Sequence, residues 1–291
     1  MRKRLLKDRL ARLVLGSFAW CAVLILLGIF LMLSINALRL VFNIGLADFF
    51  SVNWNPSAYE NPHFGIGSML ISTGLITILA MLIAVPIGIG AAACLSEILP
   101  PQVRVWIKPI IEMLAAVPSV VVGFLGIVLL GPFLAEVFNL PNGLNALNGA
   151  ILLAVMSLPT IITVAEDVIH SVSKDYKEAS YALGGNKWVT LVRVTLPACY
   201  SGLFAAVMLG MGRAVGETMT VLMVTGNATS VPHGIFDPVR TLTATIAIEM
   251  GEVPFNSQHY YSLFACGLVL FLLTLGANIL AENIAAKLRN K

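Results

Sequence analysis

Charged residues are scarce in this 291-residue sequence: only 11% are Asp, Glu, Lys or Arg, whereas 58% are hydrophobic. Soluble domains carry about 25% charged residues, so this chain has too little polar side chain to cover a surface facing water. Disorder is excluded as well, because the apolar content is high and the net charge is only +3. The composition therefore predicts an integral membrane protein with one polytopic domain, residues 1–291.

Cysteines, histidines and nucleotide motifs are also few. The four cysteines lie far apart in or beside apolar runs, which favours a packing role over disulfides. The four histidines show no metal-ligand spacing, and no G-x-x-x-x-G-K-[ST] sequence is present. We therefore expect no metal and no cofactor, and no nucleotide bound through a P-loop of this chain.

Long apolar runs predict an all-α fold of six transmembrane helices. A crossing needs about 20 apolar residues, and the first run, 13–38, is too long for the roughly 7–15 residues of a signal peptide. The predicted spans are 13–37, 67–95, 110–131, 147–166, 198–224 and 262–284.

The basic residues predict the orientation of these spans. The N-terminal tail holds six Lys and Arg, the second connection two, the fourth four and the C-terminal tail three, so 15 of the 18 lie on one face. The opposite face has only Arg39 and Arg240. Because Lys and Arg accumulate in cytoplasmic segments, both termini are expected in the cytoplasm, with the chain in a bacterial inner membrane.

Prolines and glycines within the spans predict local features. Pro86, Pro118 and Pro159 should each kink a helix, either beside a pathway or within ordinary packing. The sequence Gly88-Ile89-Gly90-Ala91-Ala92-Ala93 matches a loose dinucleotide pattern by chance, and its small residues favour close helix approach. In the long outer connection, 241–250 is the segment most typical of a short helix.

The predicted cytoplasmic loop, 173–197, contains a short helix. Ser173 can cap its start and Gly184-Gly185 can end it. Tyr176, Ala179, Ser180 and Leu183 then form one stripe at helical spacing. Such a face suits docking into a groove of a partner, although a plain connecting loop remains an equal alternative on these grounds.

This loop resembles the EAA loop of ABC importer permeases, whose pattern is E-A-A-x3-G-x9-I-x-L-P. Ser180 replaces the second Ala and Val194 replaces the Ile, both with small changes in volume. The matching residues are Glu178, Ala179, Gly184, Leu196 and Pro197. The resemblance implies a type I-like permease fold and a coupling helix that fits a cleft of a separate ATPase chain. The chain itself would then be a transport subunit and not an enzyme.

Two charges, Arg213 and Glu217, fall within the fifth predicted span. Residues four apart share a helix face, and each charge costs about 2.5–3.5 kcal/mol in hydrocarbon, so both should face the protein interior or a water-filled path. Arg213 could bind an oxyanion, with Glu217 neutralising it when the site is empty. A structural ion pair that locks helices together is the alternative, and the two roles are compatible.

The segment 212–219, GRAVGETM, is similar to a signature of the C-type (PstC-like) permeases of phosphate-specific ABC importers, and 95–97 and 116–124 also resemble that family. The resemblance implies phosphate import by alternating access. It also implies a heterodimer with an A-type permease, two ATP-binding subunits inside and a phosphate-binding protein outside. A permease for molybdate or sulfate, or an ion-coupled secondary transporter that uses Glu217 as a proton site, remain alternatives. A membrane-embedded enzyme is the weakest of them.

Overall fold

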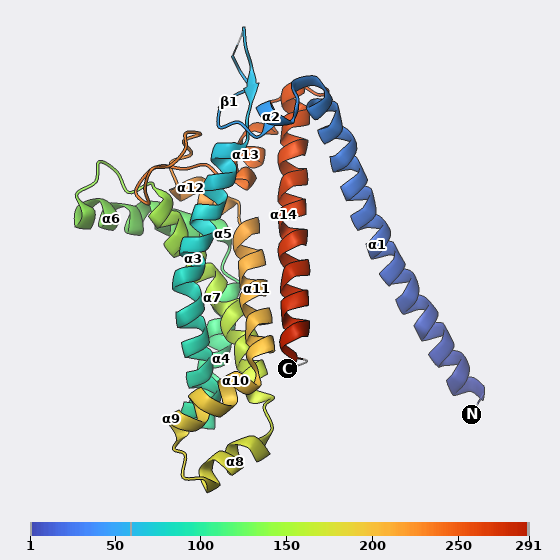
Figure 1. Ribbon diagram of the computed structural model, residues 1–291, viewed down its shortest axis with the longest axis vertical. Coiled ribbons are helices and arrows are strands. Elements are labelled where there is room, and N and C mark those ends of the chain that lie inside the picture. Colours follow the sequence, from blue (N-terminus) through green and yellow to red (C-terminus); the bar gives the residue numbers. More distant parts are fainter. Residues whose placement is uncertain (1, 59, 290–291) are drawn as a thin grey trace.

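The protein is an elongated bundle of helices with a small hairpin at one end (Figure 1). The computed structural model describes residues 2–58 and 60–289. Met1, Tyr59, Asn290 and Lys291, which the predicted single domain includes, lie outside the described residues. The all-α fold class predicted from the sequence is confirmed, because the only paired strands in the described part form one two-stranded hairpin.

Nineteen elements follow one another along the part of the chain that the structure describes. The helices are α1 (Arg2–Ile44), α2 (Leu46–Phe49), α3 (Gly67–Ala93), α4 (Pro101–Ala115), α5 (Ser119–Leu125), α6 (Gly131–Phe138), α7 (Ala146–His170), α8 (Lys174–Ala182), α9 (Lys187–Thr190), α10 (Leu196–Ala198), α11 (Tyr200–Gly216), α12 (Met219–Val224), α13 (Leu242–Glu249) and α14 (Gln258–Arg289). Short π-helical turns occupy Cys94–Ile98, Gly126–Leu130 and Leu191–Thr195. Strands β1 (Trp54–Asn55) and β2 (His63–Phe64) pair antiparallel, with Trp54 opposite Phe64.

Four of the six predicted spans are continuous helices, namely α1, α3, α7 and α14. Helices α1, α7 and α14 are longer than expected, and α3 reaches the expected length only with the π-helical turn that follows it. Among the described residues, five helical segments are long and apolar enough to cross a membrane. A sixth is reached by joining the helix 187–198 to α11, which meet at an angle of 75°. The predicted bounds of the other two spans need correction.

The third predicted span, 110–131, is wrong as a single helix. Helix α4 ends at Ala115 and α5 begins at Ser119, with Pro118 in an extended conformation between them. A proline disfavours helical backbone at the residue before it and offers no N–H to the preceding turn. Pro118 therefore breaks the helix instead of merely kinking it.

The fifth predicted span, 198–224, is also wrong as one helix. Helix α11 ends at Gly216, and Glu217 adopts an extended backbone with φ −70° and ψ 132° before α12 begins at Met219. The inference that Arg213 and Glu217 share a helix face is wrong for the same reason, since the regular spacing stops between them.

The other two prolines leave their helices intact. Pro86 lies inside α3 and Pro159 inside α7, and both helices continue past them. The short helix expected at 241–250 is confirmed as α13, where the Thr241 hydroxyl accepts a hydrogen bond from the Ala244 N–H as its cap.

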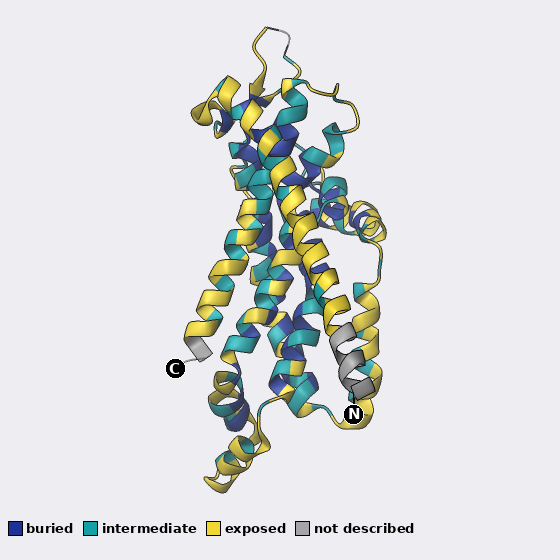
Figure 2. Cartoon of the chain, turned by 90° about the vertical axis from the view of Figure 1, so that its right-hand side faces the viewer, coloured by how far each residue is buried: buried dark blue, intermediate teal, exposed yellow. Residues whose placement is uncertain are grey.

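Buried side chains form three clusters that follow one another along the bundle. Many residues on the outer faces of the helices are exposed (Figure 2). Leu40, Trp54 and Leu242 belong to the cluster near the hairpin, and Ile169 and Leu203 to the one near α8. Many exposed side chains on α1, α3 and α14 are large and apolar. This surface suits hydrocarbon, as the composition predicts.

Close packing of α3, α7 and α11 depends on glycines. The side chain of Ile161 on α7 is fully buried between Gly88 of α3 and Gly210 of α11. A Cβ added at Gly88 would lie 2.7 Å from Cγ2 of Ile161, whereas one added at Gly90 would meet nothing within 4 Å. The small residues in α3 thus allow close helix approach, as expected.

This contrast gives a test with an internal control. We expect Gly88→Ala to lower the free energy of unfolding of the purified protein by about 1–3 kcal/mol, and its melting temperature with it, because the stiff side chain of Ile161 must move. Gly90→Ala should leave stability unchanged or slightly higher. Equal melting temperatures for the two variants would contradict this packing.

Helix α1 stands apart from the bundle over most of its length (Figure 1). It contacts α14 through Phe30 and Phe271, whose ring centroids lie 5.6 Å apart, and its buried residues Ala37 and Leu40 join the cluster near the hairpin. The start of α1 and the end of α14 lie toward the end of the bundle that carries α8 (Figure 1). This placement agrees with an even number of crossings.

Candidate functional site

Local signals define both ends of α8. The Ser173 hydroxyl accepts a hydrogen bond from the Asp175 N–H at the start. At the end, the Gly184 N–H donates to Tyr181 O and the Gly185 N–H donates to Ser180 O, both at 2.9 Å. These two bonds form a Schellman motif, which requires a left-handed residue, and Gly184 has φ +84°. The predicted cap and stop are confirmed.

Helix α8 is an exposed element at one extremity of the molecule (Figure 1). It has no buried residue, and Glu178 and Ala179 are both exposed. The Leu183 side chain is 91% exposed, and nothing lies within 4 Å of a Cβ built at Gly184. The surface made by Glu178, Ala179, Leu183 and Gly184 is therefore accessible to another protein.

The rest of the loop ties α8 to the bundle. The hydroxyls of Ser180 and Thr190 lie 2.8 Å apart, which joins α8 to α9. Leu196 packs against the buried cluster at this end, whereas Pro197 is exposed at the start of α10. The chain then bends by 75° into α11. Leu196 and Pro197 thus lie at the junction between the loop and the broken span, not on the exposed face of α8.

A salt bridge also joins α8 to α3. Nζ of Lys177 lies 2.5 Å from Oε1 of Glu97, in the π-helical turn that ends α3, and both side chains are less than a fifth exposed. Because α8 is short and otherwise exposed, this bond is a direct connection through which displacement of α8 would reach a spanning helix.

For the transport subunit that the sequence resemblance implies, we expect Lys177→Glu and Glu97→Lys each to reduce transport about tenfold, within the usual coupling range of about 1–3 kcal/mol, because two like charges would meet. The exchange Lys177→Glu with Glu97→Lys should restore most of it. Uptake by cells that carry each variant at matched expression measures the effect. No rescue by the exchange would show that the ionic contact is unimportant.

A second ionic group fixes α4 against α7. Glu166, only 1% exposed, accepts from Arg104 and, at 2.6 Å, from Lys108. Lys108 also lies 2.9 Å from the carboxylate of Asp167. Two cations compensate the buried carboxylate, which is otherwise costly in an apolar interior. This group holds the helix that leads to the break at Pro118.

The two helix breaks lie side by side. The Thr220 hydroxyl, just after the break in the fifth span, donates to Ser119 O, just after the break in the third, at 3.0 Å. Arg213 reaches across from α11, and its Nη2 lies 3.3 Å from Ala115 O, the last residue of α4. Irregular backbone at membrane depth occurs where it is buried in protein or lines a water-filled cavity. The paired breaks therefore mark a candidate pathway.

Arg213 has capacity to bind a further group. Its other contact is Nη1 to Thr160 Oγ1 at 3.5 Å, and the side chain is exposed in the isolated chain. Guanidinium has five N–H donors, and the two contacts found are long. Within the described residues it makes no ion pair, so its charge is available to an oxyanion.

Glu217 does not pair with Arg213. Its carboxylate accepts a hydrogen bond from the Thr220 N–H at 3.3 Å, and its backbone carbonyl accepts one from the Thr243 hydroxyl at 3.0 Å. The alternative role considered for these residues, a structural ion pair, is thus not formed in this conformation, because the backbone at Glu217 is extended. Glu217 instead satisfies backbone groups at the break, and α13 packs there from the hairpin end.

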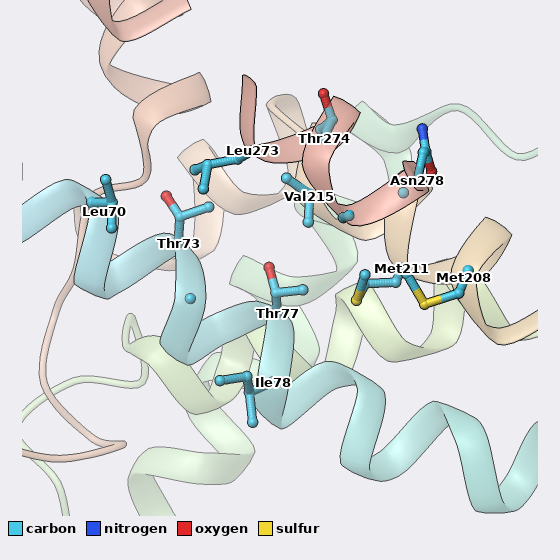
Figure 3. A pocket seen from close by; sticks show the side chains of 13 residues that line it. Leu70, Thr73, Thr77, Ile78, Met208, Met211, Val215, Leu273, Thr274 and Asn278 are labelled. Carbon is cyan, nitrogen blue, oxygen red and sulfur yellow. The ribbon is translucent and has the colours of Figure 1, made fainter. Parts of the chain in front are cut away.

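A cavity of about 240 Å³ lies on a different flank of α11, between α3 and α14 (Figure 3). Gly212 and Val215 line it but Arg213 does not, and none of its lining residues is charged. An anion there would lose its hydration without charged partners. The candidate anion site is therefore the side of α11 that faces α4 and α7. Among the described residues, no cluster of three or more His, Cys, Asp or Glu could hold a metal.

Several of these contacts were absent from the sequence-based interpretation. Each of these contacts joins two residues at least 53 positions apart in the sequence. They are Arg213 with Thr160 and with Ala115, Lys177 with Glu97, and the buried Glu166 with Arg104. The only available signal was the scarcity of charge. In a chain with so few charged residues, a charged side chain near a helix end is expected to form an ion pair or hydrogen bond with another element.

The bundle, its two adjacent breaks and its exposed short helix define a membrane transport protein of the permease class. The chain belongs to the family of binding-protein-dependent transport system inner membrane components, whose model matches residues 84–290. It is accordingly a multi-pass component of the inner membrane.

Known proteins similar to this chain agree with that family. A probable ABC transporter permease protein, YqgH, of Bacillus subtilis is 40% identical over 77% of this chain and 72% of its own length. The phosphate transport system permease protein PstC of Mesorhizobium japonicum is 33% identical over 94% of this chain and 88% of its own length. A solved inward-facing structure of the MetNI methionine ABC transporter has a TM-score of 0.60 at 16% identity, covering 77% of this chain and 95% of that chain. The last comparison supports the fold alone.

Proposed function

We propose that this chain is the membrane-spanning permease subunit of an ATP-driven ABC importer for inorganic phosphate. The observation that carries the proposal is that two helix breaks meet beside Arg213. A guanidinium without an ion-pair partner among the described residues therefore lies where the regular helical backbone is interrupted. Phosphate offers the planar pairs of oxygens that a guanidinium binds best. The names of the PstC relatives support phosphate over other oxyanions.

The same proposal assigns the partners. The exposed face of α8, with Glu178, Ala179 and Gly184, would dock into a separate ATPase chain, one copy for each of two permeases. Both termini and α8 would then be cytoplasmic. ATP hydrolysis would occur on the ATPase chains, and the permease would make and break no covalent bond.

A second permease of A type would complete the pathway. In this chain α4 and α5 leave large apolar side chains exposed next to the breaks, including Met113, Val120 and Phe124. A homologous partner placed against this face would cover it and enclose Arg213. Alternating access would follow from rocking of the two subunits when the ATPases close on α8.

Uptake of labelled phosphate by cells that carry the complete system tests the substrate and the energy source. We expect unlabelled phosphate to compete and equal concentrations of sulfate or molybdate not to compete. We also expect vanadate to inhibit uptake. Competition by sulfate would contradict the phosphate assignment, and uptake that resists vanadate but collapses with an uncoupler would indicate an ion-coupled transporter.

A further inference from the structure

The end of the molecule opposite α8 carries a half-buried polar group that the proposed transport function does not use. Glu249, the last residue of α13, is 16% exposed at its side chain and receives three hydrogen-bonding partners. Its Oε1 accepts from Arg240 at 2.7 Å and from Nε1 of Trp54 at 3.1 Å, and its Oε2 lies 2.7 Å from Nε2 of His259. One carboxylate thus joins β1, the segment before α13 and the start of α14.

Trp54 links this group to the hairpin. It is buried, pairs with Phe64 across the two strands, and packs edge-on against that ring at 6.5 Å and against His259 at 6.0 Å. The described residues between the strands, 56–58 and 60–62, project beyond every helix of the bundle (Figure 1). The hairpin therefore has a fixed base and an exposed tip.

Helix α13 links the same group to the break in the fifth span. Thr243, near its start, donates to the carbonyl of Glu217, and Thr73 on α3 accepts from the Leu242 N–H at 3.1 Å. Six residues separate Thr243 from Glu249, about 9 Å along one rigid helix at 1.5 Å per residue. Displacement of the hairpin base would therefore reach the backbone four residues from Arg213.

We infer that the hairpin is a contact for the extracytoplasmic binding protein and that Glu249 is the positioning residue that transmits this contact, through α13, to the break at Glu217. The inference rests on the proposed function, which supplies the binding protein and the ATPase. The family depends on a binding protein, and the hairpin is the most protruding feature at the end opposite α8. The contacts from Trp54 through Glu249 and α13 connect the hairpin to the break at Glu217. Binding at the hairpin could therefore change the conformation of the pathway.

The test uses the purified complex of both permeases and the ATPase in lipid nanodiscs. ATP hydrolysis is measured with increasing amounts of phosphate-loaded binding protein, for wild type, Glu249→Gln and Glu252→Gln. Glu252 is an exposed carboxylate three residues further on, so its variant is a matched control for loss of charge at this surface. We expect Glu249→Gln to keep the basal rate but to lose at least four fifths of the maximal stimulation, with Glu252→Gln unchanged.

Other outcomes are decisive too. Full maximal stimulation of Glu249→Gln, even at a higher half-saturating concentration of binding protein, would overturn the inference, because Glu249 would then only shape the surface. If Glu249→Gln fails to assemble, Trp54→Phe replaces it: this variant keeps the ring packing and removes one donor, and stimulation equal to wild type would overturn the inference. A wild-type complex that the binding protein does not stimulate would contradict the proposed function itself.

Discussion

Arg213→Gln is expected to abolish phosphate uptake while the permease still assembles with its partners. Glutamine retains hydrogen-bonding capacity but removes the charge and the fork of donors, which together are worth about 3 kcal/mol for a bidentate anion, or roughly 100-fold in binding. Assembly should survive, because the contacts of Arg213 with Ala115 and Thr160 are long and leave no buried carboxylate behind. Labelled-phosphate uptake and co-purification of the complex measure the two quantities.

Arg213→Lys is the matched control for charge. Lysine keeps the positive charge as a point donor, so we expect partial uptake with a raised half-saturating phosphate concentration. The structural alternative makes the opposite forecast, in which Arg213→Gln prevents assembly and Arg213→Lys restores it. Normal uptake by Arg213→Gln in an assembled complex would remove Arg213 from the pathway altogether.

The Arg213 region also shows where sequence-based inference stops. A spacing of four predicts a shared helix face only while the helix continues, and here it ends at Gly216. The extended backbone at Glu217 is stabilised by Thr243, which lies 26 residues further along the chain. The break at Pro118 is likewise stabilised by a residue far away in the sequence, since the Thr220 hydroxyl donates to the carbonyl of Ser119, 101 positions earlier. Local patterns contain no information about such partners, so the two broken spans were predicted as continuous helices.

Helix α8 was predicted well for the converse reason. Its start depends on Ser173 and its end on Gly184 and Gly185, all within three residues of the helix. Capping bonds are local, so residue type and position are enough to predict them. The continuous spans α3, α7 and α14 were also predictable, because their length follows from membrane thickness and their composition from hydrocarbon. What the sequence could not supply was the set of partners that position Arg213.

Gly184→Asp is expected to uncouple or detach the ATPase. The backbone at Gly184 has φ +84°, a conformation that residues with a Cβ adopt only at a cost in free energy, and the new carboxylate would lie at the negative end of the α8 dipole. It would also add a charge to the exposed face next to Leu183, where docking must exclude water. We expect uptake to fall by at least about tenfold, equivalent to about 1.4 kcal/mol of lost docking free energy.

Gly184→Asn separates the two causes of this loss. Asparagine has nearly the same shape, carries no charge and tolerates left-handed backbone better than most residues. If the surface of α8 docks into an ATPase, Gly184→Asn should retain most of the transport and bind the ATPase during purification, whereas Gly184→Asp should not. Equal loss in both variants would mean that the backbone conformation of the turn is decisive. Wild-type transport with normal ATPase binding in Gly184→Asp would contradict the docking role of α8, because a buried carboxylate without a partner at such an interface is strongly unfavourable.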